Sequence, residues 1–202
     1  STVNDKTSIG KKFYLSGFNN HFYNVTITDK QEVEVGLVIV DNNMTVSDSA
    51  IFDTSEVQVS NNLTVTSGQL ITTNLTAGSA TVTSTNAGIK SIDATDMDVT
   101  GLMTSDGAWL EIDDLNVGSD LTIGINAASE SRLSTSTLVV GGNLALDDGT
   151  LAEYLETVTV TGNINLNDTS QIVARDATST NTYPLVVTSP NVTIAAGAKV
   201  DA

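Results

Sequence analysis

A short phrase of polar and hydrophobic residues recurs along most of the chain. The phrase begins with Asn or Asp, and two hydrophobic residues then flank a position that is most often Thr. Its clear copies lie at residues 24–27, 43–46, 62–65, 120–123, 143–146, 163–166 and 191–194, and two weaker copies lie at 79–82 and 102–105. Alternation of hydrophobic and polar residues over so few positions predicts a short β-strand with one buried side.

A second alternating hydrophobic pair precedes most copies of the phrase, for example at residues 57–59 and 158–160. The corner between this pair and the phrase is rich in Asn and Gly, as at residues 141–143, and a second turn such as the Asp-Gly pair at 148–149 follows the phrase. The composition of the first kind of corner tolerates a left-handed backbone. The unit is therefore expected to be two short strands joined by tight turns.

Strands of three to five residues that recur every 17 to 28 residues predict an all-β protein with a parallel β-solenoid fold. The nine copies start at intervals of 17 to 28 residues, so we expect about nine coils whose loops vary while their strands stay in register. Helix is expected to be nearly absent. A β-sandwich, which also uses short strands, is the alternative, but it gives no reason for one phrase to return at such regular spacing.

Two phrases of the repeat also point to a known architecture. Residues 142–146 read Gly-Asn-Leu-Ala-Leu and residues 161–166 read Thr-Gly-Asn-Ile-Asn-Leu. The pattern over residues 33–202 resembles the β-helical shafts of bacterial surface adhesins and autotransporter passengers, which reuse such phrases. The resemblance implies a surface-exposed structural rod and assigns no individual residue a role.

Composition and charge narrow the classes of partner. The 202 residues include 24 Asp and Glu against 8 Lys and Arg, with a formal charge of −16, and no Cys. Thr, Ser and Asn supply 68 residues (30 + 20 + 18), so the expected surface is hydroxyl and amide. Without clustered Lys or Arg, neither nucleic acid nor an anionic membrane is an expected partner. Because no run of 18 apolar residues occurs, we expect no membrane insertion. The composition as a whole favours a secreted, extracellular or cell-surface protein.

Residues 1–32 differ from residues 33–202. They hold five of the nine aromatic residues and carry a charge of +1 (4 − 3), against −17 (4 − 21) for the remainder. An open solenoid end exposes hydrophobic core and unpaired backbone, so residues 1–32 are predicted to be an N-terminal cap or a segment that docks on a neighbouring subunit. The last coil has no capping sequence, and we expect the next subunit to cover it. The residues predicted to form this interface are Phe13, Tyr14, Phe18, Phe22, Tyr23, Val192, Ile194 and Val200.

Candidate catalytic chemistry is sparse. The carboxylate pairs at 113–114 and 147–148 would suit a polysaccharide-cleaving enzyme, but that chemistry also needs a cation or His on adjacent coils. His21 lies in the divergent N-terminal segment, and Arg132 and Arg175 are isolated in the sequence. We therefore name no catalytic residue and expect no enzyme activity.

A cluster of Asp residues is the one candidate for metal binding. Three successive coils are crowded with carboxylates, which are the oxygen ligands that Ca²⁺ prefers. The candidate ligands are Asp93, Asp96, Asp98, Asp113 and Asp114, with Asp106 and Asp120 nearby. No known calcium-binding phrase is present, so a solvated acidic face is the alternative, and no other cofactor is expected.

Six Asn-x-Ser/Thr sequences are candidate glycosylation sites. They lie at Asn24, Asn43, Asn62, Asn74, Asn167 and Asn191. Four of them coincide with the repeated phrase, so a structural need for Asn at the corner and Thr on the strand is the alternative explanation.

These features together favour a secreted structural protein that stacks head to tail with copies of itself into an extracellular filament or surface fibre. The alternative is a shaft or binding segment of a cell-surface adhesin, with a glycan or a cell-surface receptor as partner. A polysaccharide-cleaving β-helix enzyme is less favoured. An aromatic platform at Trp109, the only Trp, beside acidic and cationic side chains would support that last class.

Overall fold

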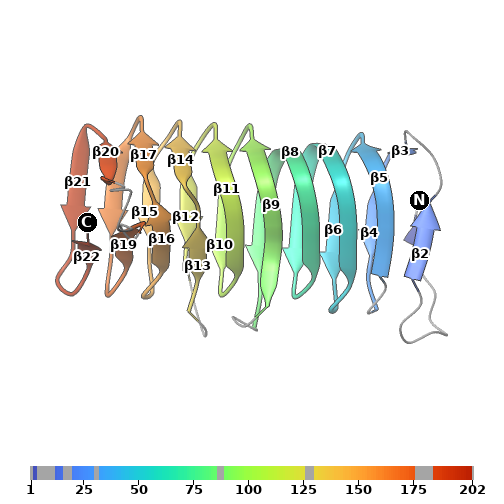
Figure 1. Ribbon diagram of the computed structural model, residues 1–202, viewed down its shortest axis with the longest axis horizontal. Coiled ribbons are helices and arrows are strands. Elements are labelled where there is room, and N and C mark those ends of the chain that lie inside the picture. Colours follow the sequence, from blue (N-terminus) through green and yellow to red (C-terminus); the bar gives the residue numbers. More distant parts are fainter. Residues whose placement is uncertain are drawn as a thin grey trace, which may run out of the picture.

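The computed structural model describes residues 2–3, 12–15, 20–29, 32–85, 89–125, 130–175 and 184–201. All regular elements in these ranges are β-strands, and they form one elongated coil with its two termini at opposite ends (Figure 1). Strands of successive turns pair in parallel throughout, from β1 with β4 to β19 with β22. The predicted parallel β-solenoid is therefore confirmed, and the β-sandwich alternative is wrong. Within the described ranges, ten strand segments stack along each of two sides of the coil and nine along the third, which is close to the nine coils expected.

Each turn adds one strand segment to each of three stacks, which we call the first, second and third faces in chain order. The first face holds β1 (Thr2–Val3), β4 (Val25–Ile27), β6 (Met44–Ser47), the last parts of β7 (Ile51–Thr66) and β8 (Gln69–Thr83), β10 (Met103–Asp106), β12 (Leu121–Ile123), β15 (Leu144–Leu146), β18 (Asn163–Leu166) and β21 (Asn191–Ile194).

The second face holds β2 (Lys12–Leu15), the first parts of β5 (Glu32–Val40), β7, β8, β9 (Lys90–Val99) and β11 (Trp109–Val117), and then β13 (Arg132–Ser134), β16 (Leu151–Leu155), β19 (Gln171–Ala174) and β22 (Lys199–Asp201). The third face holds β3 (Asn20–Phe22), the later parts of β5, β7, β8, β9 and β11, and then β14 (Thr137–Val140), β17 (Thr157–Val160) and β20 (Val186–Thr188).

Register between turns stacks equivalent residues into columns. On the first face, Thr45 lies level with Thr64, and Thr64 with Thr81. The flanking Val65 and Val82 point inward and are fully buried. Burying one such side chain contributes roughly 1.5–3 kcal/mol, and the alternation repeats on every face, so the core is a continuous hydrophobic column along the axis.

The two kinds of corner differ in backbone conformation. Left-handed residues gather where the first face turns into the second, as at Ser67 (φ 52°), Asp148 (φ 49°) and Asp168 (φ 53°). At the corner between the third and first faces, which includes residues 141–143, no described residue has a positive φ. The Asn- and Gly-rich corner, whose composition tolerates left-handed backbone, therefore does not use it in the described residues; its small residues provide space between turns. A Cβ on Gly141 would lie within 3.0 Å of the Gly118 carbonyl oxygen.

Asn side chains at this second corner join neighbouring turns. The Asn24 Oδ1 accepts a hydrogen bond from the Asn43 backbone N–H at 3.1 Å, and the Asn43 Oδ1 accepts one from the Asn62 N–H at 3.2 Å. Farther along, the Asn143 Oδ1 accepts from the Asn163 N–H at 3.0 Å. The repeated Asn therefore supplies a rung of a polar ladder between turns, which accounts for its place at the start of the phrase.

The described parts of residues 1–32 join the same coil. β2 and β3 pair with β5, and β1 pairs with β4, all in parallel. Whether this segment acts as a cap or as a docking segment stays a prediction. Nowhere in the described ranges is there a helix of the length and hydrophobicity that crossing a membrane requires.

Candidate functional site

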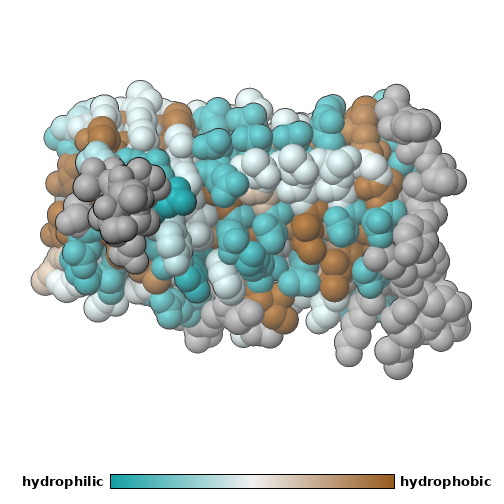
Figure 2. Space-filling model, viewed as in Figure 1, coloured by the Kyte–Doolittle hydropathy of each residue, from teal (hydrophilic) through white to brown (hydrophobic). Residues whose placement is uncertain are grey.

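None of the described residues covers the outer side of the last coil. Val192, Ile194 and Val200 are 47%, 49% and 38% exposed. Their register partners one turn earlier are Ile164, Leu166 and Ile172, of which none is more than 1% exposed. The brown, hydrophobic surface at the C-terminal end in Figure 2 is consistent with these values. The three predicted C-terminal interface residues are thus brought together on one surface, which we call the terminal coil (β20, β21 and β22).

The predicted N-terminal interface residues lie at the other end. Phe22 is partly buried against the core, whereas Tyr23 is 67% exposed. Phe13 and Tyr14 lie on β2, level with Val33 and Glu34, and Phe18 lies outside the described residues. The four described positions, Phe13, Tyr14, Phe22 and Tyr23, therefore belong to the end of the rod opposite the terminal coil (Figure 1).

The candidate calcium ligands are spread over two faces. Asp93 lies on the second face and binds Lys90, with Nζ–Oδ2 at 3.2 Å. Asp96 and Asp114 lie level with each other on the third face, and Asp98 accepts a hydrogen bond from Asn116 at 3.1 Å. Asp113 lies next to Asp114, near the corner between the two faces. No group of three or more His, Cys, Asp or Glu side chains suited to a metal ion occurs in the described ranges, so calcium binding stays a prediction.

The candidate glycosylation sites are mostly engaged in contacts between turns. Asn62 donates from Nδ2 to Asn43, Asn191 donates to Asn163 at 2.9 Å, and Asn167 donates to Asp147 at 2.5 Å. Asn74 lies exposed on the third face, level with Glu56 and Asp96. The ladder supports the structural explanation for Asn at the corner, and glycosylation stays a prediction at all six sites.

A groove of about 720 Å³ runs along the second face and its edge with the third. Four successive turns line it, and they supply two aromatic rings, two guanidinium groups and three carboxylates. These side chains are Trp109, Glu111, Asp113, Asp114, Arg132, Tyr154 and Arg175. It contains Trp109, the residue at which an aromatic platform beside charged side chains would support a polysaccharide-cleaving enzyme.

The Trp109 ring is covered by cations. Trp109 lies between Lys90 and Arg132 in its column, and the Lys90 Nζ and the Arg132 Cζ lie over the ring at 5.7 and 4.6 Å from its centroid. Such cation–π contacts contribute about 0.5–2 kcal/mol. The indole is therefore a rung of a column, and a flat ligand would have to displace a cation to stack on it.

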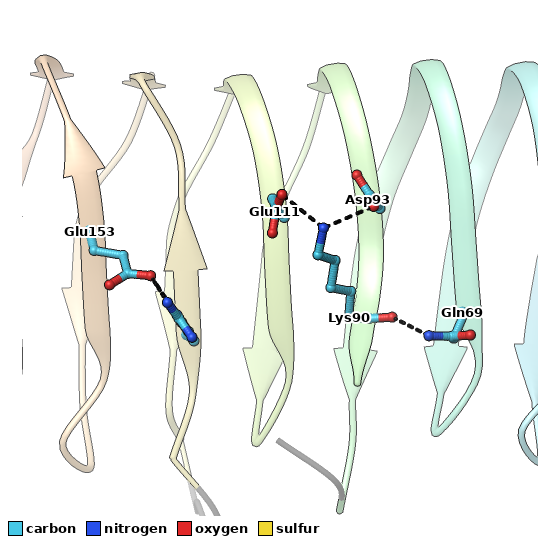
Figure 3. Close-up of polar contacts among 6 residues, drawn as sticks. Gln69, Lys90, Asp93, Glu111 and Glu153 are labelled. Atoms are coloured by element: carbon cyan, nitrogen blue, oxygen red, sulfur yellow. Dashed lines mark hydrogen bonds and ion pairs between the residues drawn. The ribbon is translucent and has the colours of Figure 1, made fainter. Parts of the chain in front are cut away.

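Ion pairs with neighbouring turns hold both cations in place (Figure 3). The Lys90 Nζ lies 2.8 Å from Glu111 Oε1, and Arg132 pairs with Glu153, with Nε donating to Oε1 at 2.5 Å. The hydrogen bond to Glu111 raises the pKa of Lys90 above its ordinary value of 10.5, and Asp93 adds to the shift. Lys90 thus stays charged, and carboxylates of neighbouring turns neutralise both cations of the column.

The sequence did not reveal this column. Lys90, Trp109 and Arg132 are separated by 19 and 23 residues, steps like those of the repeat itself. The signal was thus available, but the varying intervals between turns hide which residues share a column. No family model matches the chain, and no curated protein or solved structure is detectably similar to it.

Proposed function

We propose that this protein is a secreted structural subunit, without enzyme activity, whose rods stack end to end into an extracellular fibre. The observation that carries the proposal is that Val192, Ile194 and Val200 are exposed among the described residues. Their register partners one turn earlier are buried. A hydrophobic strand edge of this kind is a template for another strand. We take its partner to be the first coil of a second copy.

The two ends of the rod have matching organisation. β1, β2 and β3 are the outermost described strands of the three faces at one end, and β21, β22 and β20 are their counterparts at the other. A second copy in register would set β1 against β21 and β2 against β22. The same tetrapeptide, Asn-Val-Thr-Ile, occurs at residues 191–194 and at residues 24–27, which pair with β1 one turn inside the joint, so the columns on the two sides of the joint would have the same pattern.

A contact between opposite ends does not close on itself. Such heterologous interfaces generate filaments when no rotation brings the chain of subunits back to its start. The charge distribution supports the same geometry, because residues 33–202 carry −17 and the sides of two rods repel each other. Residues 1–32, with a charge of +1, do not add to this repulsion.

The proposal is tested by one substitution on the terminal coil and one on the side of the rod. Ile194→Asp places a charge on the terminal coil, whereas Val139→Asp places the same charge on the third face, where Val139 is 37% exposed. We expect the wild type and the Val139→Asp variant to sediment as large assemblies at high concentration and the Ile194→Asp variant as single rods.

Two outcomes would contradict the proposal. Equal assembly of all three proteins would show that the terminal coil is not the joint. Single wild-type rods at every concentration would favour the alternative, a segment of a cell-surface adhesin shaft in which further chain covers this coil.

A further inference from the structure

The groove on the second face contains a strained and exposed aromatic residue. Tyr154 has φ 62° and is 48% exposed, and the register of β16 with β19 shifts between Ala152 and Leu155. A left-handed backbone is costly for a bulky residue, and strained residues of this kind concentrate at functional sites. The bulge brings the phenol ring to the wall of the groove.

The cations of the groove are already neutralised. Arg132 is bound to Glu153, and Arg175 donates to Glu156 Oε1 at 2.7 Å. A chain with a formal charge of −16 adds a long-range repulsion against anions. An anionic ligand would therefore have to break an ion pair to enter.

The carboxylates and hydroxyls of the groove remain open to a ligand. Within the described ranges the carboxylates of Asp113 and Asp114 have neither an ion-pair nor a hydrogen-bond partner, and Ser134 and Ser136 line the groove beside them. Carboxylate oxygens accept hydrogen bonds from ligand hydroxyl groups, and serine hydroxyls both donate and accept. A cationic ligand would also be attracted by these carboxylates and by the formal charge of −16, so the test includes a cationic probe.

The indole of Trp109 adds an unsatisfied donor. Its Nε1–H is buried and has no acceptor among the described residues. A buried donor without a partner costs roughly 1–3 kcal/mol, and a ligand oxygen brought within reach would remove part of that cost.

We propose that this groove binds a neutral carbohydrate chain along the rod axis, because it combines the exposed, strained ring of Tyr154 with open carboxylates and with cations already paired. The sugar's apolar ring face would stack on Tyr154, and its hydroxyl groups would donate to Asp113 and Asp114. The groups that line the groove are spread over four turns at about 4.8 Å per turn, so the site suits an extended oligosaccharide better than a single sugar. This proposal is independent of end-to-end assembly.

Fluorescence of Trp109, the only Trp, reports directly on the groove. The full chain is titrated with soluble neutral hexasaccharides (β-1,4-glucan, α-1,4-glucan, β-1,4-mannan, β-1,4-xylan and chitin-derived), with oligogalacturonate as the anionic probe and with oligolysine as the cationic probe. We expect saturable binding of at least one neutral hexasaccharide and weaker or no binding of the charged probes.

The decisive variant is Tyr154→Gly. Glycine adopts φ 62° without strain, so the variant removes the ring without adding backbone strain at position 154. We expect about tenfold weaker binding with an unchanged thermal midpoint, and near-normal binding for Tyr154→Phe. Tyr23→Gly, which removes another exposed tyrosine at the end of the rod, is the matched control and should bind like the wild type.

Three results would each overturn the inference. These are no response to any neutral hexasaccharide, a response confined to the anionic or cationic probe, and equal affinity of the wild type and the Tyr154→Gly variant.

Discussion

The last two turns of the rod have the same pattern of hydrophobic and polar residues but opposite environments. Leu166 on β18 is fully buried, whereas Ile194 lies level with it on β21 and is 49% exposed. The difference comes from position alone, because a further turn covers Leu166 and none of the described residues covers Ile194. A solenoid turn is thus complete only with a neighbour on both sides, and its stability is shared between turns.

Truncation of Leu166 and of Ile194 should have the largest difference in effect on stability. Leu166→Ala should lower the free energy of unfolding by about 2–5 kcal/mol, because it leaves a cavity in a packed column. Ile194→Ala should cost less than about 1 kcal/mol in dilute, unassembled samples. Denaturant titration of both variants measures the difference. Equal losses would mean that the terminal coil is packed in solution.

A glycine pair tests how tightly the turns approach at the Asn corner. Gly141→Ala should lower the free energy of unfolding by about 1–3 kcal/mol, because the new methyl group meets the Gly118 backbone. Gly36 has no atom within 4 Å of an added Cβ, so Gly36→Ala should be neutral or stabilising by up to about 1 kcal/mol. Similar thermal midpoints for the two variants would show that the corner relaxes freely.

The Asn ladder gives a smaller contrast between an inner and an outer rung. The Asn143 side chain forms hydrogen bonds with Asp120 on one neighbouring turn and with Asn163 on the other. Among the described residues, the Asn191 side chain forms one with Asn163 alone, at 2.9 Å. Asn143→Ala should cost about 1–2 kcal/mol and Asn191→Ala roughly half of that. Thermal unfolding of the two variants provides the comparison, and a larger loss at Asn191 would contradict the ladder as a shared contact.

The ion pairs of Lys90 should change the stability of the rod only at alkaline pH. The pKa of Lys90 is raised, so its ion pairs stabilise the folded state fully below about pH 10.5 and are lost as the pH rises through the higher folded value. Glu111→Gln removes the main cause of the shift. The variant should therefore lose less stability than the wild type between neutral and strongly alkaline pH. Parallel alkaline unfolding curves would contradict this role for Glu111.

The sequence was sufficient to predict the columns of the core. Val46, Val65 and Val82 each occupy the same place in the phrase, and each is fully buried in the same column. Period-two alternation identifies the inward residue without knowledge of any other turn, which is why this part of the fold follows from local pattern.

Features that depend on register between turns were less predictable. The Lys90, Trp109 and Arg132 column and the left-handed Tyr154 arise from how turns of unequal length align. The same holds for the corner glycines, since their role is set by the backbone of the next turn. Local composition gave turns at the right places but could not distinguish left-handed corners from crowded ones.

Electron microscopy of the purified full-length protein over a range of concentrations tests end-to-end stacking most directly. End-to-end stacking with β1 against β21 predicts unbranched fibres with an axial repeat of about 48 Å, because ten strands stack on the first face at about 4.8 Å each. Ile194→Asp should abolish them, and Val139→Asp should not. Uniform single rods of the wild-type protein under every condition would contradict end-to-end stacking.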